Sequence, residues 1–174
     1  MRFATLFLLL LLSACSGLKP APSSVDRHLE SLLQYANSLK GVAYRYGGDS
    51  PQSGFDCSGF VSHVFARSGI TLPRVSEDMA RQLPALKEGA LARGDLVFFN
   101  TSGRSFSHVG IYLGERQFIH AASSRGGRVM TSSMTEAYWS KRFDGARRPW
   151  PSGTSSSSAS GSSRATASSA RTSR

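Results

Sequence analysis

The chain has 174 residues, the size of one domain with short tails, and 40% of them are hydrophobic, which is enough to bury a core. Its 17 glycines argue against a purely helical bundle, and its two cysteines exclude a disulfide-stapled mini-fold and a multi-cysteine zinc module. The net charge is +10, but without the four arginines of the two ends residues 15–150 carry 17 basic and 11 acidic residues, a net +6 that favours an anionic partner.

Residues 1–14 have the form of a secretory signal peptide. Arg2 is followed by a short apolar run that ends in small residues; it is too short to span a bilayer as a mature helix, and it has no polar face that a core helix would show. Cys15 comes next, and Leu-Ser-Ala-Cys resembles the lipobox of bacterial lipoproteins. The resemblance implies cleavage before Cys15, acylation of that residue and anchoring in a membrane. The alternative is an ordinary signal peptide followed by a free thiol.

A lipidated Cys15 has two consequences. Ser16 follows it and, by analogy with lipoprotein sorting in Gram-negative cells, a residue other than Asp there implies the periplasmic face of the outer membrane. Cys57 would then be the one remaining thiol of an exported protein, without an intramolecular disulfide partner. Such a thiol is either an inert buried residue or a nucleophile.

We expect residues 15–24 to be a lipidated cysteine and a Pro-containing linker, and residues 25–150 to form the globular catalytic domain. Ser24 or Asp26 can cap a first helix, which Gly41 ends. Its apolar residues recur every three or four positions, as one helical face requires. They are Leu29, Leu32, Leu33, Ala36 and Leu39.

Residues 47–55 have the composition of turns, and Asp56 is the expected cap of a second helix that stops at Ser68 and Gly69. Its apolar face consists of Phe60, Val61, Val64 and Phe65. A short third helix is predicted over 76–83.

Beyond Gly94 the hydrophobic period changes to that of strands. The predicted strands cover 95–100, 107–113, 118–122, 127–131 and 143–148. Helices followed by an antiparallel meander favour an α+β fold over a doubly wound α/β sheet. Residues 151–174 contain 11 serines and no aromatic or large aliphatic residue, which predicts a disordered basic tail.

Cys57, His108 and His120 form the candidate catalytic constellation. Cys57 stands at a predicted helix start, where unpaired N–H groups lower the pKa of a thiol and where its own N–H can hold an oxyanion. Gly59 is expected to leave room for a substrate backbone. If the two histidine strands pair, His120 can orient His108 as the base for Cys57.

Other interpretations of these residues stay open. A lone cysteine or strand histidine is more often structural, as we expect for His28 and His63. Cys57, His108 and His120 are also legitimate zinc ligands, although their long spacing matches no compact zinc motif. We expect no metal and no organic cofactor.

The chain resembles the NlpC-type cell-wall cysteine peptidases in successive motifs over about residues 27–148. Any one motif is weak, but their order together with the lipobox is specific. They are GVAYRYGG at 41–48, DCSGF at 56–60, LPRVS at 72–76, GDLVFF at 94–99, SHVGIY at 107–112 and FIHA at 118–121. Arg93, where the family often has proline, and the Ser-rich tail depart from the pattern. Residues 101–106 are expected to form a cleft rim where specificity differs between relatives.

The resemblance implies a papain-like α+β fold and hydrolysis of peptide bonds in peptidoglycan stems. It makes Cys57 the nucleophile, His108 the base and His120 the orienting residue. The nearest subgroup is that of short Gram-negative murein endopeptidase lipoproteins without additional wall-binding domains.

Three further residues match positions that line the site or face the substrate in relatives, and they are therefore candidate substrate-binding residues. Tyr44 corresponds to a tyrosine of the site, and Asp56 and Ser58 flank the nucleophile. The alternatives are plain packing for Tyr44 and a helix cap alone for Asp56.

We therefore expect a monomeric, lipid-anchored thiol hydrolase that cleaves a stem or cross-bridge peptide bond of peptidoglycan. One alternative is a non-catalytic wall-binding lipoprotein. Another is an amidase or acyltransferase on the same fold. A third, nucleic-acid binding by the basic tail, is disfavoured by export, and we expect no nucleic-acid partner.

Overall fold

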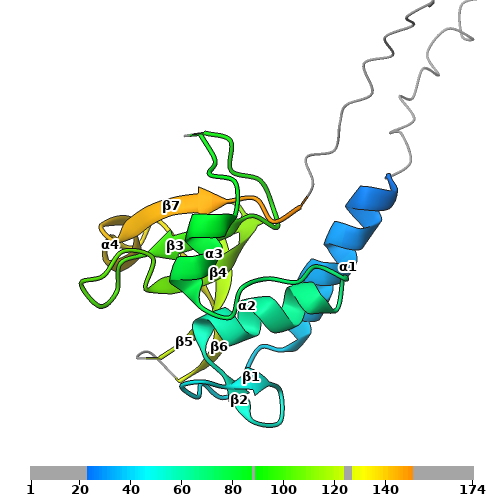
Figure 1. Ribbon diagram of the computed structural model, residues 1–174, viewed down its shortest axis with the longest axis horizontal. Coiled ribbons are helices and arrows are strands. Elements are labelled where there is room, and N and C mark those ends of the chain that lie inside the picture. Colours follow the sequence, from blue (N-terminus) through cyan, green and yellow to red (C-terminus); the bar gives the residue numbers. More distant parts are fainter. Residues whose placement is uncertain (1–22, 88, 124–126, 151–174) are drawn as a thin grey trace, which may run out of the picture.

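The computed structural model describes residues 23–87, 89–123 and 127–150 (Figure 1). Their elements, in chain order, are α1 (Ser24–Ser38), β1 (Asp49–Ser50), β2 (Gly54–Phe55), α2 (Cys57–Ala66), α3 (Ser76–Gln82), β3 (Leu96–Phe99), β4 (His108–Gly114), β5 (Gln117–Ala122), β6 (Arg128–Ser133), α4 (Ala137–Ser140) and β7 (Phe143–Arg147). The α+β prediction is confirmed, with helices first and an antiparallel sheet after them. Cys15 and the tail 151–174 lie outside the described residues. In the described part, no helix has the length and apolarity needed to cross a membrane.

The main sheet has five antiparallel strands in the order β6-β5-β4-β3-β7. Strands β3 to β6 form the expected meander. The last strand departs from it, because β7 returns to the opposite edge and pairs with β3. β3 is thereby a central strand, and its four residues are fully buried.

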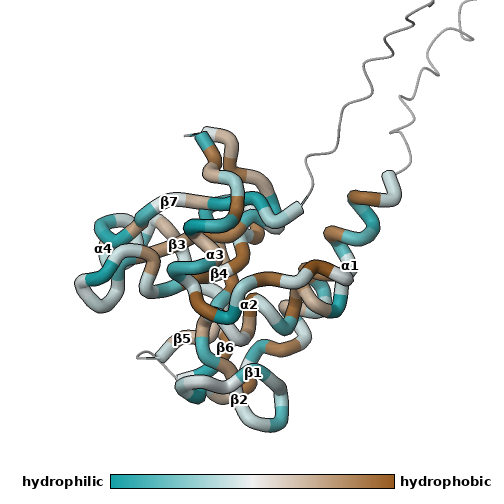
Figure 2. Tube along the Cα trace, in the orientation of Figure 1, coloured by the Kyte–Doolittle hydropathy of each residue, from teal (hydrophilic) through white to brown (hydrophobic). Residues whose placement is uncertain are grey.

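Alternate residues of β3 enter two different hydrophobic clusters. Leu96 and Phe98 pack in the cluster that contains the buried faces of α1 and α2. Val97 and Phe99 pack on the other face, together with Trp139 of α4. Figure 2 shows the hydrophobic segments gathered where the helices meet the sheet and the hydrophilic ones in the outer loops. The sheet is therefore covered on both faces, which explains why β3 has no polar alternation.

The first helix begins one residue earlier than predicted. Ser23 is the N-cap, and its Oγ accepts a hydrogen bond from the N–H of Asp26 at 3.1 Å, while the Asp26 carboxylate accepts from the N–H of Ser23 at 3.0 Å. This reciprocal pair is a capping box. Asp26 thus takes the third helical position rather than the cap.

Three short elements were not predicted from the sequence. The segment 47–55, expected to be turns, contains the two-residue strands β1 and β2 paired as a small hairpin. α4 has only four residues, too few to show a helical period. Both matter for the site, since the hairpin lies beside the start of α2 and α4 supplies Trp139.

Gly59 is required by close packing and does not leave space for a substrate. A Cβ built there would lie 2.1 Å from the carbonyl oxygen of Gly48. The same oxygen accepts a hydrogen bond from the N–H of Asp56 at 3.0 Å. The backbone before the β1–β2 hairpin therefore rests directly on the first turn of α2 and fixes the place of Cys57.

The substitution Gly59→Ala is expected to destabilise the protein by about 1–3 kcal/mol, because the methyl group would meet a rigid backbone carbonyl. Helix propensity alone predicts the opposite sign, a stabilisation of about 1 kcal/mol. Thermal unfolding of the purified full chain and of the variant would decide between them. An unchanged or higher melting temperature would contradict this account of the Gly48 contact.

Candidate active site

Cys57 is the first residue of α2, and its surroundings favour the neutral thiol. Asp56 caps the helix, and its carboxylate accepts a hydrogen bond from the N–H of Gly59 at 2.7 Å. Burial raises the pKa of Cys57 to about 11, and the negative charge of Asp56 acts in the same direction. Hydrogen bonds from the backbone N–H groups of Val109, Ser58 and Cys57 itself oppose this shift. The lowered thiol pKa expected from the helix start is thus outweighed by desolvation.

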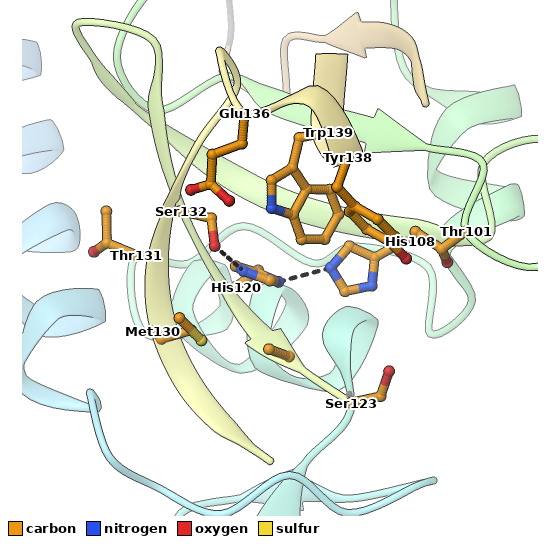
Figure 3. A pocket seen from close by; sticks show the side chains of 11 residues that line it. Thr101, His108, His120, Ser123, Met130, Thr131, Ser132, Glu136, Tyr138 and Trp139 are labelled. Carbon is orange, nitrogen blue, oxygen red and sulfur yellow. Dashed lines mark hydrogen bonds between the residues drawn. The ribbon is translucent and has the colours of Figure 1, made fainter. Parts of the chain in front are cut away.

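The two predicted histidines meet. Nε2 of His108 on β4 and Nδ1 of His120 on β5 are 2.8 Å apart, with the rings nearly perpendicular at 85° (Figure 3). Gly110, two residues after His108, makes this approach possible. A Cβ on Gly110 would lie 3.2 Å from the Cβ of His120 and 2.6 Å from the ring of Phe118. The β4–β5 hairpin therefore brings the two histidines together only because Gly110 has no side chain.

A third residue continues the chain of hydrogen bonds. Nε2 of His120 lies 3.0 Å from Oγ of Ser132 on β6 (Figure 3). Burial lowers the pKa of His108 to about 4, and burial together with the neighbouring His108 lowers that of His120 well below its usual value. Both imidazoles are therefore neutral at pH 7, and each has one N–H.

The protons of this chain can be assigned from its geometry. If Nδ1 of His108 is to accept the thiol proton, its Nε2–H must donate to Nδ1 of His120. The remaining N–H of His120 is then on Nε2 and donates to Oγ of Ser132. In that arrangement Ser132 selects the tautomer of His120, and His120 selects that of His108.

The Trp139 indole holds the histidine rings in place. Its ring lies 5.4 Å from that of His108 at an angle of 31° and 5.0 Å from that of His120 at 84°. Figure 3 shows the indole above both imidazoles, on one side of the line of hydrogen bonds. Neither Ser132 nor Trp139 was singled out from the sequence, since a serine in a strand and a tryptophan in a four-residue helix carry no signal of their own.

Cys57 opens into a cleft of about 450 Å³, and all three candidate substrate-binding residues line it. Besides Cys57 these are Tyr44, Asp56 and Ser58. The cleft also contains Arg74, whose guanidinium bonds both carboxylate oxygens of Asp56, at 2.9 and 2.8 Å. Arg74 belongs to the LPRVS motif, so the sequence held the signal that could have found it.

Asp56 is more than a helix cap. Burial alone would raise its pKa, but hydrogen bonds from Arg74, Gly59 and Ser58 and the charge of Arg74 hold the pKa below its usual value. Arg74 also donates to the Ser58 hydroxyl at 3.0 Å. Asp56 therefore stays ionised and links the helix start to the floor of the cleft. Burial also raises the pKa of Tyr44, with Cys57 and Asp56 adding to the effect, so its phenol is a hydrogen-bond donor at neutral pH.

The loop 101–106 borders three hollows, one of which is lined by Gly103. Arg104 lines the Cys57 cleft, and Thr101 lines a second pocket beside His108. Phe106 has a left-handed backbone, with φ of 57°, and its N–H donates to the Asp144 carboxylate at 2.8 Å. The loop is thus anchored to β7 in the position expected of a rim.

The zinc alternative finds no support in the geometry. Within residues 23–87, 89–123 and 127–150, no group of three or more His, Cys, Asp and Glu side chains is placed to hold a metal ion. The nitrogens of His108 and His120 that face each other are engaged in their own hydrogen bond. His63 bonds the Tyr35 hydroxyl at 2.7 Å and His28 bonds the carbonyl of Ser24, so both lie outside the constellation.

Comparisons with known proteins agree on one family. The sequence pattern of the NlpC/P60 family matches residues 41–148. Murein DD-endopeptidase MepS/Murein LD-carboxypeptidase of Escherichia coli K12 is 44% identical over 126 residues, covering 72% of this chain and 64% of the relative. Probable endopeptidase NlpC of the same organism is 41% identical over 156 residues, covering 85% and 99%.

A solved structure extends the agreement to the fold. The NLP/P60 family protein of Staphylococcus aureus, described as similar to lipoprotein, matches with a TM-score of 0.65 at 31% identity, over 75% of this chain and 44% of that one. The chain spans less than two thirds of the length of the first relative, MepS, at 64%.

A neutral Cys57 thiol beside a neutral His108 imidazole predicts how Cys57 reacts with iodoacetamide. If His108 is the base of Cys57, His108→Ala removes that base, and the alkylation rate of the thiol should then rise about tenfold per pH unit toward its high pKa. The protein with His108 should react at least about tenfold faster at pH 7, because the imidazole accepts the proton as the sulfur attacks. Rates are measured by mass spectrometry on the peptide that contains Cys57.

The exposed His28 supplies the matched control. His28→Ala should alkylate at the rate of the unsubstituted protein, since His28 bonds only to α1 backbone among the described residues. Equal rates at pH 7 with and without His108 would show that this residue is not the base of Cys57.

Proposed function

Because the chain belongs to the NlpC/P60 family, we propose that it is a cysteine peptidase that hydrolyses peptide bonds of peptidoglycan. The observation that carries the proposal is the hydrogen-bonded chain from His108 through His120 to Ser132, next to Cys57 at a helix start. The sulfur of Cys57 accepts a hydrogen bond from the backbone N–H of Val109, the residue after His108. Both Escherichia coli relatives are named endopeptidases, and one is named a murein endopeptidase.

The reaction proceeds through a thioester. Sγ of Cys57 attacks the carbonyl carbon of the scissile bond while Nδ1 of His108 takes the thiol proton. The resulting oxyanion accepts a hydrogen bond from the backbone N–H of Cys57. The imidazolium then gives its proton to the leaving amine, the C–N bond breaks, and a water deprotonated by the same imidazole attacks the thioester. The C–S bond then breaks, and the imidazolium returns the proton to the sulfur of Cys57.

The buried environment shapes this sequence of steps. Since burial disfavours both a lone thiolate and a lone imidazolium, charge is separated only as a pair of adjacent ions. His120 stabilises the imidazolium by accepting its Nε2–H, and Ser132 keeps His120 in the tautomer that can do so. In this proposal His120 and Ser132 are positioning residues that act through His108.

We assign the acyl side of the substrate to the Cys57 cleft, where Tyr44, Asp56 and Ser58 contact it. The Asp56–Arg74 ion pair gives this cleft both a carboxylate and a guanidinium. Peptidoglycan stems contain both free amines and free carboxylates, so either charge has a partner there. No step of this chemistry calls for a metal or an organic cofactor.

We place the enzyme at the cell envelope as a monomeric lipoprotein. The support is the lipobox at Cys15, with Ser16 after it, which implies a lipid anchor on the periplasmic face of the outer membrane. Peptidoglycan lies within reach of that surface. The excess of basic residues in the domain suits a carboxylate-rich polymer.

Digestion of purified peptidoglycan tests the proposal. The full chain, purified in detergent, should release new fragments whose masses identify the bond, and Cys57→Ala should lower their rate of release at least about a thousandfold. Absence of fragments from a protein that circular dichroism shows to be folded would favour a non-catalytic wall-binding lipoprotein. Cleavage of lipid or small amide substrates but not of muropeptides would favour an amidase or acyltransferase.

Ser132→Ala should lower kcat about five- to tenfold with little change in KM, because the variant loses one hydrogen bond that fixes the tautomer of His120. Ser132→Thr retains the hydroxyl and should recover most of the activity. If Ser132 had a purely structural role, Ser132→Ala would lower the melting temperature without lowering kcat selectively over KM. Equal activity of Ser132→Ala and the unsubstituted enzyme would remove Ser132 from the mechanism.

A further inference from the structure

Two segments that are far apart in the sequence form walls of the Cys57 cleft. One wall is the start of α3, with Glu77, and the other is the loop 101–106, with Arg104. A carboxylate oxygen of Glu77 and a guanidinium nitrogen of Arg104 are 3.9 Å apart, so the two walls approach each other through charged side chains. The width of the cleft therefore depends on how α3 and this loop are held in place.

Arg147 fixes the end of α3 to the sheet. It belongs to β7, which lies beside α3 in Figure 1, and its Nε donates a hydrogen bond to the carbonyl oxygen of Ala80 at 2.6 Å. In a longer helix this carbonyl would accept a hydrogen bond from the N–H of residue 84, but that residue is Pro84 and has no N–H. Arg147 therefore supplies a donor that the helix itself cannot supply.

The same guanidinium reaches the end of the loop 101–106. It lies 5.3 Å from the ring of Phe106 and 5.9 Å from the ring of Phe98 on β3, and both distances are in the range of cation–π contacts. The two rings also meet edge to face, with their centres 5.9 Å apart. Since the N–H of Phe106 is bound by the Asp144 carboxylate, β7 holds this residue at its backbone and at its ring.

Arg147 thus connects the supports of both walls without lining the Cys57 cleft, since it is not among the described residues around that cleft. Its contacts lie on the helix side of the sheet, in the cluster that contains Phe98. The histidine rings pack against Trp139, which belongs to the cluster on the other face. Loss of the Arg147 side chain would therefore loosen the two walls and leave the histidine pair in place.

We propose that Arg147 is a positioning residue that sets the width of the Cys57 cleft by holding α3 and the loop 101–106 at a fixed separation. The inference rests on the proposed function, because it takes this cleft to bind the acyl half of the substrate. A wider and less ordered cleft weakens the binding of substrate and transition state alike. Such a change raises KM and leaves kcat as it was.

Arg147→Met tests this role, because methionine has a long unbranched side chain without a donor or a charge. With a synthetic stem peptide that contains the bond identified by digestion, KM should rise about fivefold while kcat changes less than about twofold. In Arg147→Gln, KM should rise only about twofold, since the side-chain amide nitrogen takes the place of Nε and can donate to Ala80. An unchanged KM in Arg147→Met, or a lower kcat at unchanged KM, would overturn the proposal.

Arg148→Gln is the matched control for stability. Arg148 is the next residue and also anchors a loop, since its guanidinium donates to the carbonyl of Ala90 at 2.9 Å and to the Asp95 carboxylate at 2.8 Å. The control should have a lower melting temperature and the KM of the unsubstituted enzyme. If both variants raised KM equally at similar losses of melting temperature, general destabilisation would explain the effect and the proposal would fail.

Spin labels on the two walls measure the cleft without catalysis. Arg81→Cys on α3 and Ser105→Cys on the loop provide the labelling sites, in a full chain whose two native cysteines are replaced. The distance between the labels, measured by pulsed electron paramagnetic resonance, should become longer and more broadly distributed in Arg147→Met and stay unchanged in Arg148→Gln. Identical distributions with and without Arg147→Met would overturn the proposal. Cleavage of no peptide by the unsubstituted enzyme would count against the proposed function, and the label distances would then decide the role of Arg147 independently.

Discussion

The candidate site depends on the pairing of β4 with β5, because this pairing alone places His108 and His120 on adjacent strands. The pairing is antiparallel, with Ile111 opposite Ile119. The hydrogen bond between the two rings also depends on Gly110, because a Cβ there would lie 3.2 Å from the Cβ of His120. A one-residue slip of register would turn one histidine to the other face of the sheet. The hydrophobic alternation that buries the strands on α2 therefore also sets the geometry of the candidate site.

Burial gives this geometry its chemical character. The aromatic cluster around Trp139 removes water from the histidines, and desolvation then keeps both imidazoles and the Cys57 thiol neutral in the resting protein. A neutral thiol is a poor nucleophile, so in the proposed mechanism the thiol reacts only when His108 accepts its proton. The same desolvation strengthens the attraction between a thiolate and an imidazolium once both exist. The desolvation that keeps the thiol neutral is thus also the reason why the thiol needs a base next to it.

The sequence predicted most elements with a strong period and the residues of the constellation, but not the parts that hold that constellation in place. The apolar face of α2 and the strand β3 were predictable because each follows from one local pattern. The return of β7 to β3, the hairpin that packs on Gly59 and the placement of Trp139 over the histidines were not, since each depends on contacts between distant segments. The role of Gly59 illustrates the limit. The sequence showed that a helix tolerated an unfavourable residue, and only the structure shows that the carbonyl of Gly48 occupies the space.

The Cys57 cleft and the pocket beside His108 are built on different elements. In the Cys57 cleft, Asp56 pairs with Arg74 and also caps α2, so the charged groups of this cleft are fixed to the helix that carries Cys57. The second pocket, beside His108, is lined by Glu136 on the short segment before α4 and by Trp139 of α4, which packs against both histidines. A change in α4 would therefore alter the surroundings of His108, whereas a change at Arg74 would act through the start of α2.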